Sequence, residues 1–167
     1  MPTPPRAGLR TMVIAILTVA TLDLSYVWVL WVLVRQKITT EQLLQSIATG
    51  LLGREAYQGG LPTAFLGGVL HVLIAAIWCT IFWLLLRHLP RLGAIVARPR
   101  GRVVLGFAWG MVIWWCMDLI VLPLSRARPV PIGSGTFLVN TVQHGLMIGI
   151  PMALILGRRF TAHSAET

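Results

Sequence analysis

The stretch PTAFLGGVLHVLIAAIWCTIFWLLL (residues 62–86) contains no Lys, Arg, Asp or Glu and stops at Arg87. A helix needs about 20 apolar residues to cross the roughly 30 Å of hydrocarbon in a bilayer. Backbone amides and carbonyls in lipid must pair within their own segment, which favours a helix over an open strand. The stretch therefore predicts a membrane-spanning helix.

Three further apolar runs of similar length lie on either side of this one. Arg10 and Arg35 bound the first, Arg102 and Pro123 bound the third, and the fourth stops before Arg158. The four runs cover residues 11–34, 62–86, 103–122 and 136–156. We therefore predict an all-α membrane protein in which residues 1–167 form a single domain. Its four transmembrane helices would form an up-down bundle.

The composition agrees with a chain that has lipid as its solvent. Hydrophobic residues make up 56% and charged residues only 11%, with a mean hydropathy of +0.79, whereas a soluble domain carries about 25% charged residues. A net charge of +9 is also found in nucleic-acid-binding proteins. The Lys and Arg residues here flank the apolar runs, where they set topology. We therefore predict a lipid environment and no nucleic-acid partner.

The basic residues also predict the orientation of the chain. With four spans, both termini share a side with the loop between the second and third spans. That side carries nine basic residues: Arg6, Arg10, Arg87, Arg91, Arg98, Arg100, Arg102, Arg158 and Arg159. The other side carries five: Arg35, Lys37, Arg54, Arg126 and Arg128. Because basic residues are retained in the cytoplasm, we expect both termini to be cytoplasmic.

The segment 38–60 is the only sizeable part between the runs with a helical pattern of its own. Thr39 or Thr40 can cap a helix. Leucine and isoleucine residues then recur at helical spacing as far as Leu52. We predict a short amphipathic helix that lies on the outer leaflet or over the mouth of the bundle.

Five stretches between Thr21 and Leu154 carry a resemblance to known proteins: TLDLSY (21–26), GLLGREAYQGG (50–60), TAFLGGVLHVLIA (63–75), VLPLS (121–125) and QHGLMIGIPMAL (143–154). In them the chain resembles a group of small bacterial four-helix integral inner-membrane proteins that are functionally uncharacterised. The resemblance implies a four-helix fold and a bacterial inner membrane, and it implies no activity.

Each predicted span carries one ionisable residue in the central or outer half of the bilayer. Asp23 lies near the middle of the first run, where it costs about 2.5–3.5 kcal/mol. At a rise of about 1.5 Å per residue, His71 and His144 lie at nearly the same depth. Asp118 lies in the outer third of its run, and Asn140 one turn before His144. These five residues are the predicted buried polar cluster.

Small residues at four-residue spacing predict where helices pack closely. Gly106 and Gly110 form such a pair on the third run, and Gly145 and Gly149 on the fourth. Ala64 and Gly68 form a third pair, on the second run. Pro151 removes a backbone donor, which predicts a kink one turn beyond His144.

Three interpretations of the predicted cluster stay open. Its residues could be hydrogen-bonding glue between helices, worth about 0.6 kcal/mol each. They could relay protons or line a route for a small solute. Alternatively, His71 and His144 could ligate a metal ion or a haem, with Asp23 or Asp118 as a further ligand or orienting group.

Motifs of soluble enzymes are absent, and neither Cys79 nor Cys116 has a partner cysteine nearby. The sequence therefore does not indicate an enzyme and predicts no cofactor. It favours a small transporter or an accessory membrane module. The alternatives are a metal- or haem-binding membrane redox protein, and a purely structural or partner-binding subunit. Four helices leave little room for a wide pathway, so a homodimer or a partner membrane protein is a further alternative.

A last expectation concerns the loop between the second and third spans. Arg98, Arg100 and Arg102 are expected to contact anionic lipid headgroups there.

Overall fold

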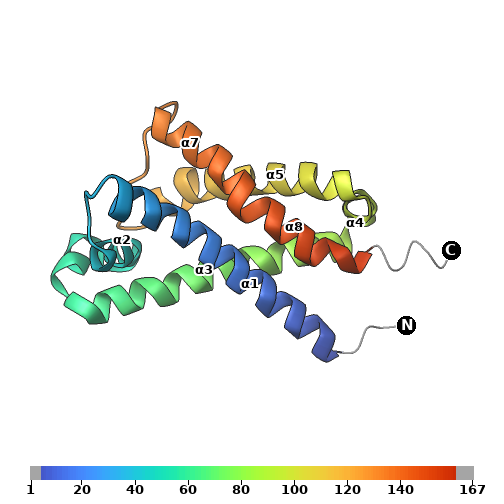
Figure 1. Cartoon of the computed structure of the whole chain (residues 1–167), viewed down its shortest axis with the longest axis horizontal. Helices are drawn as coiled ribbons and strands as arrows, with labels where there is room; N and C mark the ends of the chain where they lie inside the picture. The colour runs from blue at the N-terminus through green and yellow to red at the C-terminus, as the bar shows by residue number, and fades with distance from the viewer. Residues whose placement is uncertain (1–4, 161–167) are drawn as a thin grey trace.

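The computed structural model describes residues 5–160, with the side chains of residues 8–158 and 160, and every regular element in that range is helical (Figure 1). Four of its helical stretches are long and apolar enough to cross a bilayer: Gly8–Val34, Gly60–His88, Pro99–Leu124 and Gly135–Leu156. Each of the four predicted runs lies inside one of these stretches, which we call spans 1 to 4. They indicate a multi-pass membrane protein.

Three of the four spans contain more than one helical segment. Span 1 joins α1 (Pro5–Trp28) to the π-helical η1 (Val29–Val34), and span 2 is the single helix α3 (Gly60–His88). Span 3 consists of α5 (Pro99–Cys116), the π-helical η3 (Met117–Val121) and α6 (Leu122–Leu124). Span 4 consists of α7 (Gly135–His144), the π-helical η4 (Gly145–Gly149) and α8 (Ile150–Leu156). The remaining elements are α2 (Thr40–Leu52), α4 (Pro90–Ala97) and the 3₁₀ turns η2 (Gly53–Gln58) and η5 (Gly157–Phe160).

The spans alternate in direction between two ends of the molecule. The start of α1, helix α4 and the end of α8 lie at one end, which we call the terminal end (Figure 1). Helix α2 and the start of α7 lie at the opposite end, which we call the loop end. Two of the arginines counted at the terminal end, Arg6 and Arg159, have side chains outside the described part of the chain.

The π-helical segments in spans 3 and 4 each precede a proline at the same spacing. η3 is followed by Pro123 and η4 by Pro151. In span 4 the N–H of Ile150 donates to the carbonyl of Gly145, five residues earlier. Proline lacks an N–H and its ring clashes with the carbonyl four residues before it, so a wider turn relieves the clash. A π-helical segment thus lies directly after His144 and before Pro151, and the kink itself stays a prediction.

Helix α2 is fixed at its start by its own side chains. Thr39 Oγ1 accepts from the N–H of Gln42 at 3.1 Å, and Gln42 Oε1 accepts from the N–H of Thr39 at 3.0 Å. This is a capping box, which satisfies two otherwise free donors of the first turn. Trp28 Nε1 donates to Thr40 Oγ1 at 3.0 Å and ties α2 to span 1.

The body of α2 packs against α3 at the loop end and covers the mouth of the bundle (Figure 1). Gln45 is buried and donates to the first backbone carbonyl of α3 at 3.1 Å. A Cβ added at Gly67 would overlap the carbonyl group of Leu44, so the two backbones touch there. The predicted pairing of Ala64 with Gly68 is therefore wrong for Gly68, which has no atom within 4 Å of an added Cβ. The small residue of this helix that permits close packing is Gly67, and the element that packs against it is α2 and not another span.

The glycine pairs predicted to allow close packing on spans 3 and 4 lie against each other. A Cβ added at Gly106 would lie 2.7 Å from the carbonyl oxygen of Gly149. A Cβ added at Gly149 would lie 2.5 Å from the nitrogen of Gly110, and one at Gly110 would lie 2.7 Å from the Cα of Gly145. Because backbone meets backbone at every one of these points, only glycine allows this crossing.

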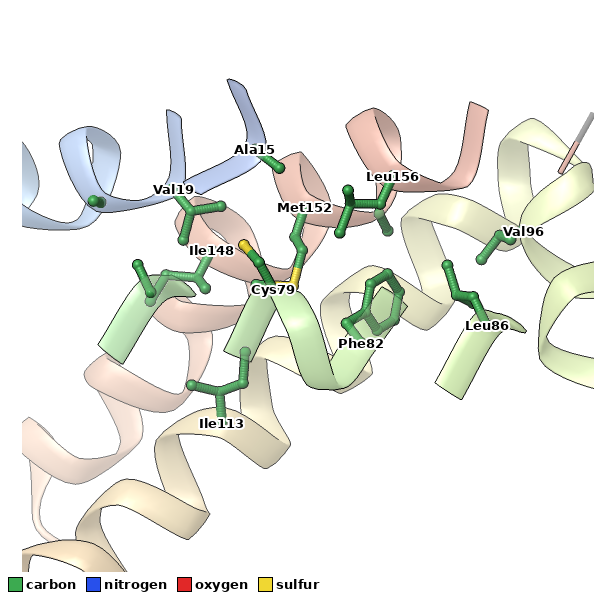
Figure 2. Close-up of a cluster of buried hydrophobic side chains, with 13 residues drawn as sticks. Ala15, Val19, Cys79, Phe82, Leu86, Val96, Ile113, Ile148, Met152 and Leu156 are labelled. Atoms are coloured by element: carbon green, nitrogen blue, oxygen red, sulfur yellow. The ribbon is translucent and has the colours of Figure 1, made fainter. Parts of the chain in front are cut away.

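An apolar core extends from the middle of the molecule to the terminal end. Cys79 and Phe82 of α3 lie close to Met152 of α8 in this core, and Ile113 of α5 belongs to the same core (Figure 2). Its buried members come from all four spans and from α4: Ala15, Val19, Ala20, Ala75, Cys79, Phe82, Leu86, Val96, Ile113, Ile148, Met152, Ala153 and Leu156. The terminal end is therefore closed by packed apolar side chains.

Candidate functional site

A cavity of about 370 Å³ lies on the loop-end side of the apolar core. All four spans, α2 and the segment after α6 (residues 125–134) contribute to its wall. At about 30 Å³ per water molecule it has room for roughly a dozen waters. Most of the wall is apolar, but three of the lining side chains are ionisable: Asp23, His71 and His144. We call this space the central cavity.

Asp23 of α1 is bonded to span 4. Gln143 Nε2 donates to Asp23 Oδ1 at 2.8 Å, and Gln143 itself is buried. The bond gives the carboxylate a partner, which an acidic residue inside a membrane requires. The second oxygen, Asp23 Oδ2, has no hydrogen-bond partner among the described residues.

The two histidines each donate one ring N–H to a backbone carbonyl. His71 Nε2 lies 2.9 Å from the oxygen of Ala20 in α1, and His144 Nδ1 lies 3.0 Å from the oxygen of Asn140 in its own helix. Because a carbonyl oxygen only accepts, the hydrogen lies on Nε2 of His71 and on Nδ1 of His144. The opposite nitrogens, His71 Nδ1 and His144 Nε2, are then acceptors without a partner in the described part of the chain.

Charged and aromatic groups surround His144. Asp23 and His71 line the same cavity as His144. The ring of Trp114, which also lines the central cavity, lies 4.8 Å from the His144 ring at an angle of 50°. On its other side Trp114 contacts Phe137 at a ring distance of 6.0 Å. These contacts fix the position of the imidazole at the wall.

Two hydroxyl groups complete the polar part of the wall. Ser46 of α2 donates to the carbonyl of Leu43 at 2.6 Å, and Ser125 donates to the carbonyl of Leu122 at 2.8 Å. Both hydroxyl hydrogens are thus bonded within their own turn. Ser125 Oγ also accepts from the N–H of Ala127 at 3.0 Å, whereas Ser46 Oγ accepts no bond from the described residues. These serines show that α2 and the segment after α6 belong to the site.

An aromatic cluster fills the space between α3 and α5 on the terminal-end side of the central cavity. Trp109 of α5 lies 5.9 Å from Trp78 and 5.5 Å from Phe82 of α3, measured between ring centres. Trp78 also lines the cavity. The same side chain therefore belongs both to the cavity wall and to the seal towards the terminal end.

Asp118 and Asn140 do not line the central cavity. Asp118 is fully buried, and its Oδ1 accepts from the N–H of Val130 at 2.8 Å, which holds the segment after α6 against span 3. Asn140 contributes its backbone carbonyl to His144. Depth along a helix predicts the height of a residue but not the direction in which it faces, so the five predicted residues divide into three at the cavity and two elsewhere.

The described residues do not form a ready metal site. No three His, Cys, Asp or Glu side chains among residues 5–160 lie close enough together to hold a metal ion. His71 and His144 offer one unpartnered nitrogen each, which is fewer ligands than the three that such a site needs.

The three arginines predicted to contact lipid headgroups differ from one another. Arg98 and Arg100 are exposed on a groove between α4 and α5 that is walled by apolar residues such as Ile95 and Val104. Arg102 is only 9% exposed, and its Nε donates to the carbonyl of Val96 at 2.6 Å. Arg102 thus caps the end of α4. Lipid contact by the three arginines stays a prediction.

Sequence reasoning missed several residues of the site. Gln143 is the neighbour of His144 in the sequence. Its bond to Asp23 could not be predicted, because the sequence does not tell how span 4 is rotated about its axis. The place of Ser46 in the cavity wall could not be predicted, because α2 was expected to lie outside the spans. Trp78 looks like an ordinary apolar residue of span 2.

No protein family, curated protein or solved structure matches the chain. A function for it therefore has to be inferred from the central cavity.

Proposed function

We propose that the chain is a small transporter of a bacterial inner membrane, with both termini in the cytoplasm, and that the central cavity is its solute site. The bacterial membrane is supported by the resemblance in five stretches of sequence. The orientation is supported by the excess of basic residues on the side of the termini. The transport role is supported by the central cavity.

One observation carries this proposal: Asp23, His71 and His144 come from three different spans and line one cavity, each of them only half-buried. Ionisable groups inside a membrane that face an open space mark solute or proton pathways in transporters. A cavity of about 370 Å³ is large enough for a small solute.

Helix packing accounts for only part of this arrangement. The bonds from Gln143 to Asp23 and from His71 to Ala20 do join spans, as packing glue would. Glue does not require that Asp23 and both imidazoles keep an unpartnered acceptor beside a cavity. Packing fixes where these side chains lie, and the remaining acceptors are available to a solute.

The two ends of the cavity are closed differently, which is compatible with access from one side at a time. Towards the terminal end it is sealed by Trp78, Phe82 and Trp109 together with the apolar core. Towards the loop end the cover is α2, which is a single short helix. The π-helical segment η4 directly follows His144, and such segments are common where helices bend at functional sites.

Cysteine labelling tests the proposal. In a background with Cys79→Ala and Cys116→Ala, single cysteines are introduced as Ser46→Cys and His71→Cys. Ala153→Cys, at a core position with no exposed surface, is the matched control. A small, charged, membrane-impermeant thiol reagent is applied to right-side-out and to inside-out vesicles.

We expect Ser46→Cys and His71→Cys to react and Ala153→Cys to stay unlabelled. Reaction of His71→Cys from both sides would support passage through the membrane. Reaction from one side alone would favour an accessory module with a binding pocket, in which a homodimer or partner subunit completes the route. Absence of reaction at both cavity positions would overturn the proposal.

Elemental analysis tests the metal or haem alternative on the same preparation. Near-stoichiometric iron, copper or zinc in protein purified without chelator, lost in His71→Ala and in His144→Ala, would replace the transporter proposal by a redox function.

A further inference from the structure

The polar wall of the central cavity consists almost entirely of acceptors. The ring hydrogens of His71 and His144 are bonded to backbone carbonyls, as are the hydroxyl hydrogens of Ser46 and Ser125. Asp23 has only acceptors when it is ionised. Apart from the two indoles, no polar side chain of the wall has a free hydrogen to donate to a ligand.

Of the two indole groups of the wall, Trp78 keeps an N–H that has no hydrogen-bond partner among the described residues. Trp114 Nε1 is buried without a partner and is not accessible from the cavity. The rings of Trp114 and Trp78 form part of the apolar wall.

The net charge of the wall also favours a cation. Asp23 is its only acidic residue, and no Lys or Arg lines the cavity. With both imidazoles neutral, the wall carries one negative charge that is partly shielded from water. A ligand that brings hydrogen-bond donors and a positive charge would satisfy both the lone pairs and the carboxylate.

We infer that the central cavity takes a small organic cation with several N–H donors, such as a guanidinium or a primary ammonium group. The inference rests on the proposed function, because it names the solute class of that same cavity. A bare metal ion fits less well, since the described side chains provide no set of three ligands around one point. A guanidinium group spreads its donors over a plane and reaches acceptors that stand apart.

Protons should compete with this cation. The titratable groups that line the cavity are Asp23 of α1, His71 of α3 and His144 of α7. The lining residues of α2, α5, η3, η4, α6 and the segment after α6 add no titratable group to the wall. Protonation of an imidazole turns its free acceptor into a donor and adds a positive charge, so it opposes the cation on both counts.

Tryptophan fluorescence of the purified full chain in detergent provides a binding assay. The probes are guanidinium, its neutral planar counterpart urea, acetate, and tetramethylammonium, which is a permanent cation without N–H donors. Guanidinium keeps its charge at every pH used, as the arginine side chain does. The variants are Asp23→Asn, which keeps an oxygen for Gln143, and Asp23→Glu, which keeps the charge. Glu55→Gln, at an exposed acid outside the cavity, is the control.

We expect saturable binding of guanidinium, at least about tenfold tighter than that of urea or tetramethylammonium. Asp23→Asn should weaken it at least about tenfold, Asp23→Glu should retain most of it, and Glu55→Gln should leave it unchanged. Binding should weaken when the pH is lowered far enough to protonate the cavity imidazoles.

Other outcomes separate this inference from the proposed function. Equal or tighter binding of urea or acetate would overturn the cation class and leave a solute site in place. Binding of none of the probes, together with reactive cysteines at positions 46 and 71, would also overturn the cation class alone. Binding of none, together with unreactive cysteines at both positions, would remove both.

Discussion

The crossing of spans 3 and 4 allows a quantitative test by the substitution Gly149→Ala. A Cβ at this position would overlap the carbonyl oxygen of Gly106 and lie 2.8 Å from the Cα of Gly110. These are backbone atoms, which cannot swing aside as a flexible side chain would. The two spans must therefore separate. Gly68→Ala is the matched control, because an added Cβ there has no atom within 4 Å.

The comparison of the two variants isolates the packing cost. Replacing a helical glycine by alanine improves helix propensity by about 1 kcal/mol, and this gain is common to both variants. Overpacking in a close contact costs about 1–3 kcal/mol. For a chain of this size 1 kcal/mol corresponds to about 2–4 °C in Tm. Gly149→Ala should therefore melt about 2–12 °C below Gly68→Ala.

Thermal unfolding in one detergent, followed by tryptophan fluorescence and by near-ultraviolet circular dichroism, measures this difference. The two variants are compared at the same protein concentration, and gel filtration establishes that both begin as one species. Equal melting temperatures would refute the reasoning, because they would mean that the glycine crossing tolerates a side chain.

One further substitution tests the segment after α6, and a pair of fusions tests the orientation of the chain. Asp118→Ala removes the acceptor of the Val130 N–H and should lower the free energy of unfolding by about 1–3 kcal/mol. It should also speed protease cleavage within residues 126–134, and an unchanged cleavage rate would speak against the bond. Alkaline phosphatase, which is active only outside the cytoplasm, should be inactive when fused after residue 167 and active when fused after residue 58; the reverse result would invert the orientation.

The spans could be predicted from the sequence because their signal is one-dimensional. An apolar run of sufficient length gives a helix whatever it packs against, and Arg87 marks the end of span 2 to within a residue or so of the helix end at His88. The glycine pairs of spans 3 and 4 were predictable for a related reason. Four-residue spacing repeats one face of a helix without any knowledge of the partner.

The site depended on information that spacing does not hold. Asp118 bonds the segment after α6, whereas His144 lines the cavity. Which face each residue presents depends on the rotation of its span, and the π-helical segments before Pro123 and Pro151 alter that rotation. The role of Gly67 depended likewise on α2, whose position follows from tertiary packing.

The bond between Gln143 and Asp23 has a consequence for the synthesis of the chain. The two residues are 120 positions apart. At about 5–20 residues per second, a ribosome needs about 6–24 s to add that length. The first span is therefore made long before its partner in span 4 exists. For that interval the carboxyl group of Asp23 has to be sheltered by water, by a proton or by another protein, and insertion of this chain is complete only when its last span arrives.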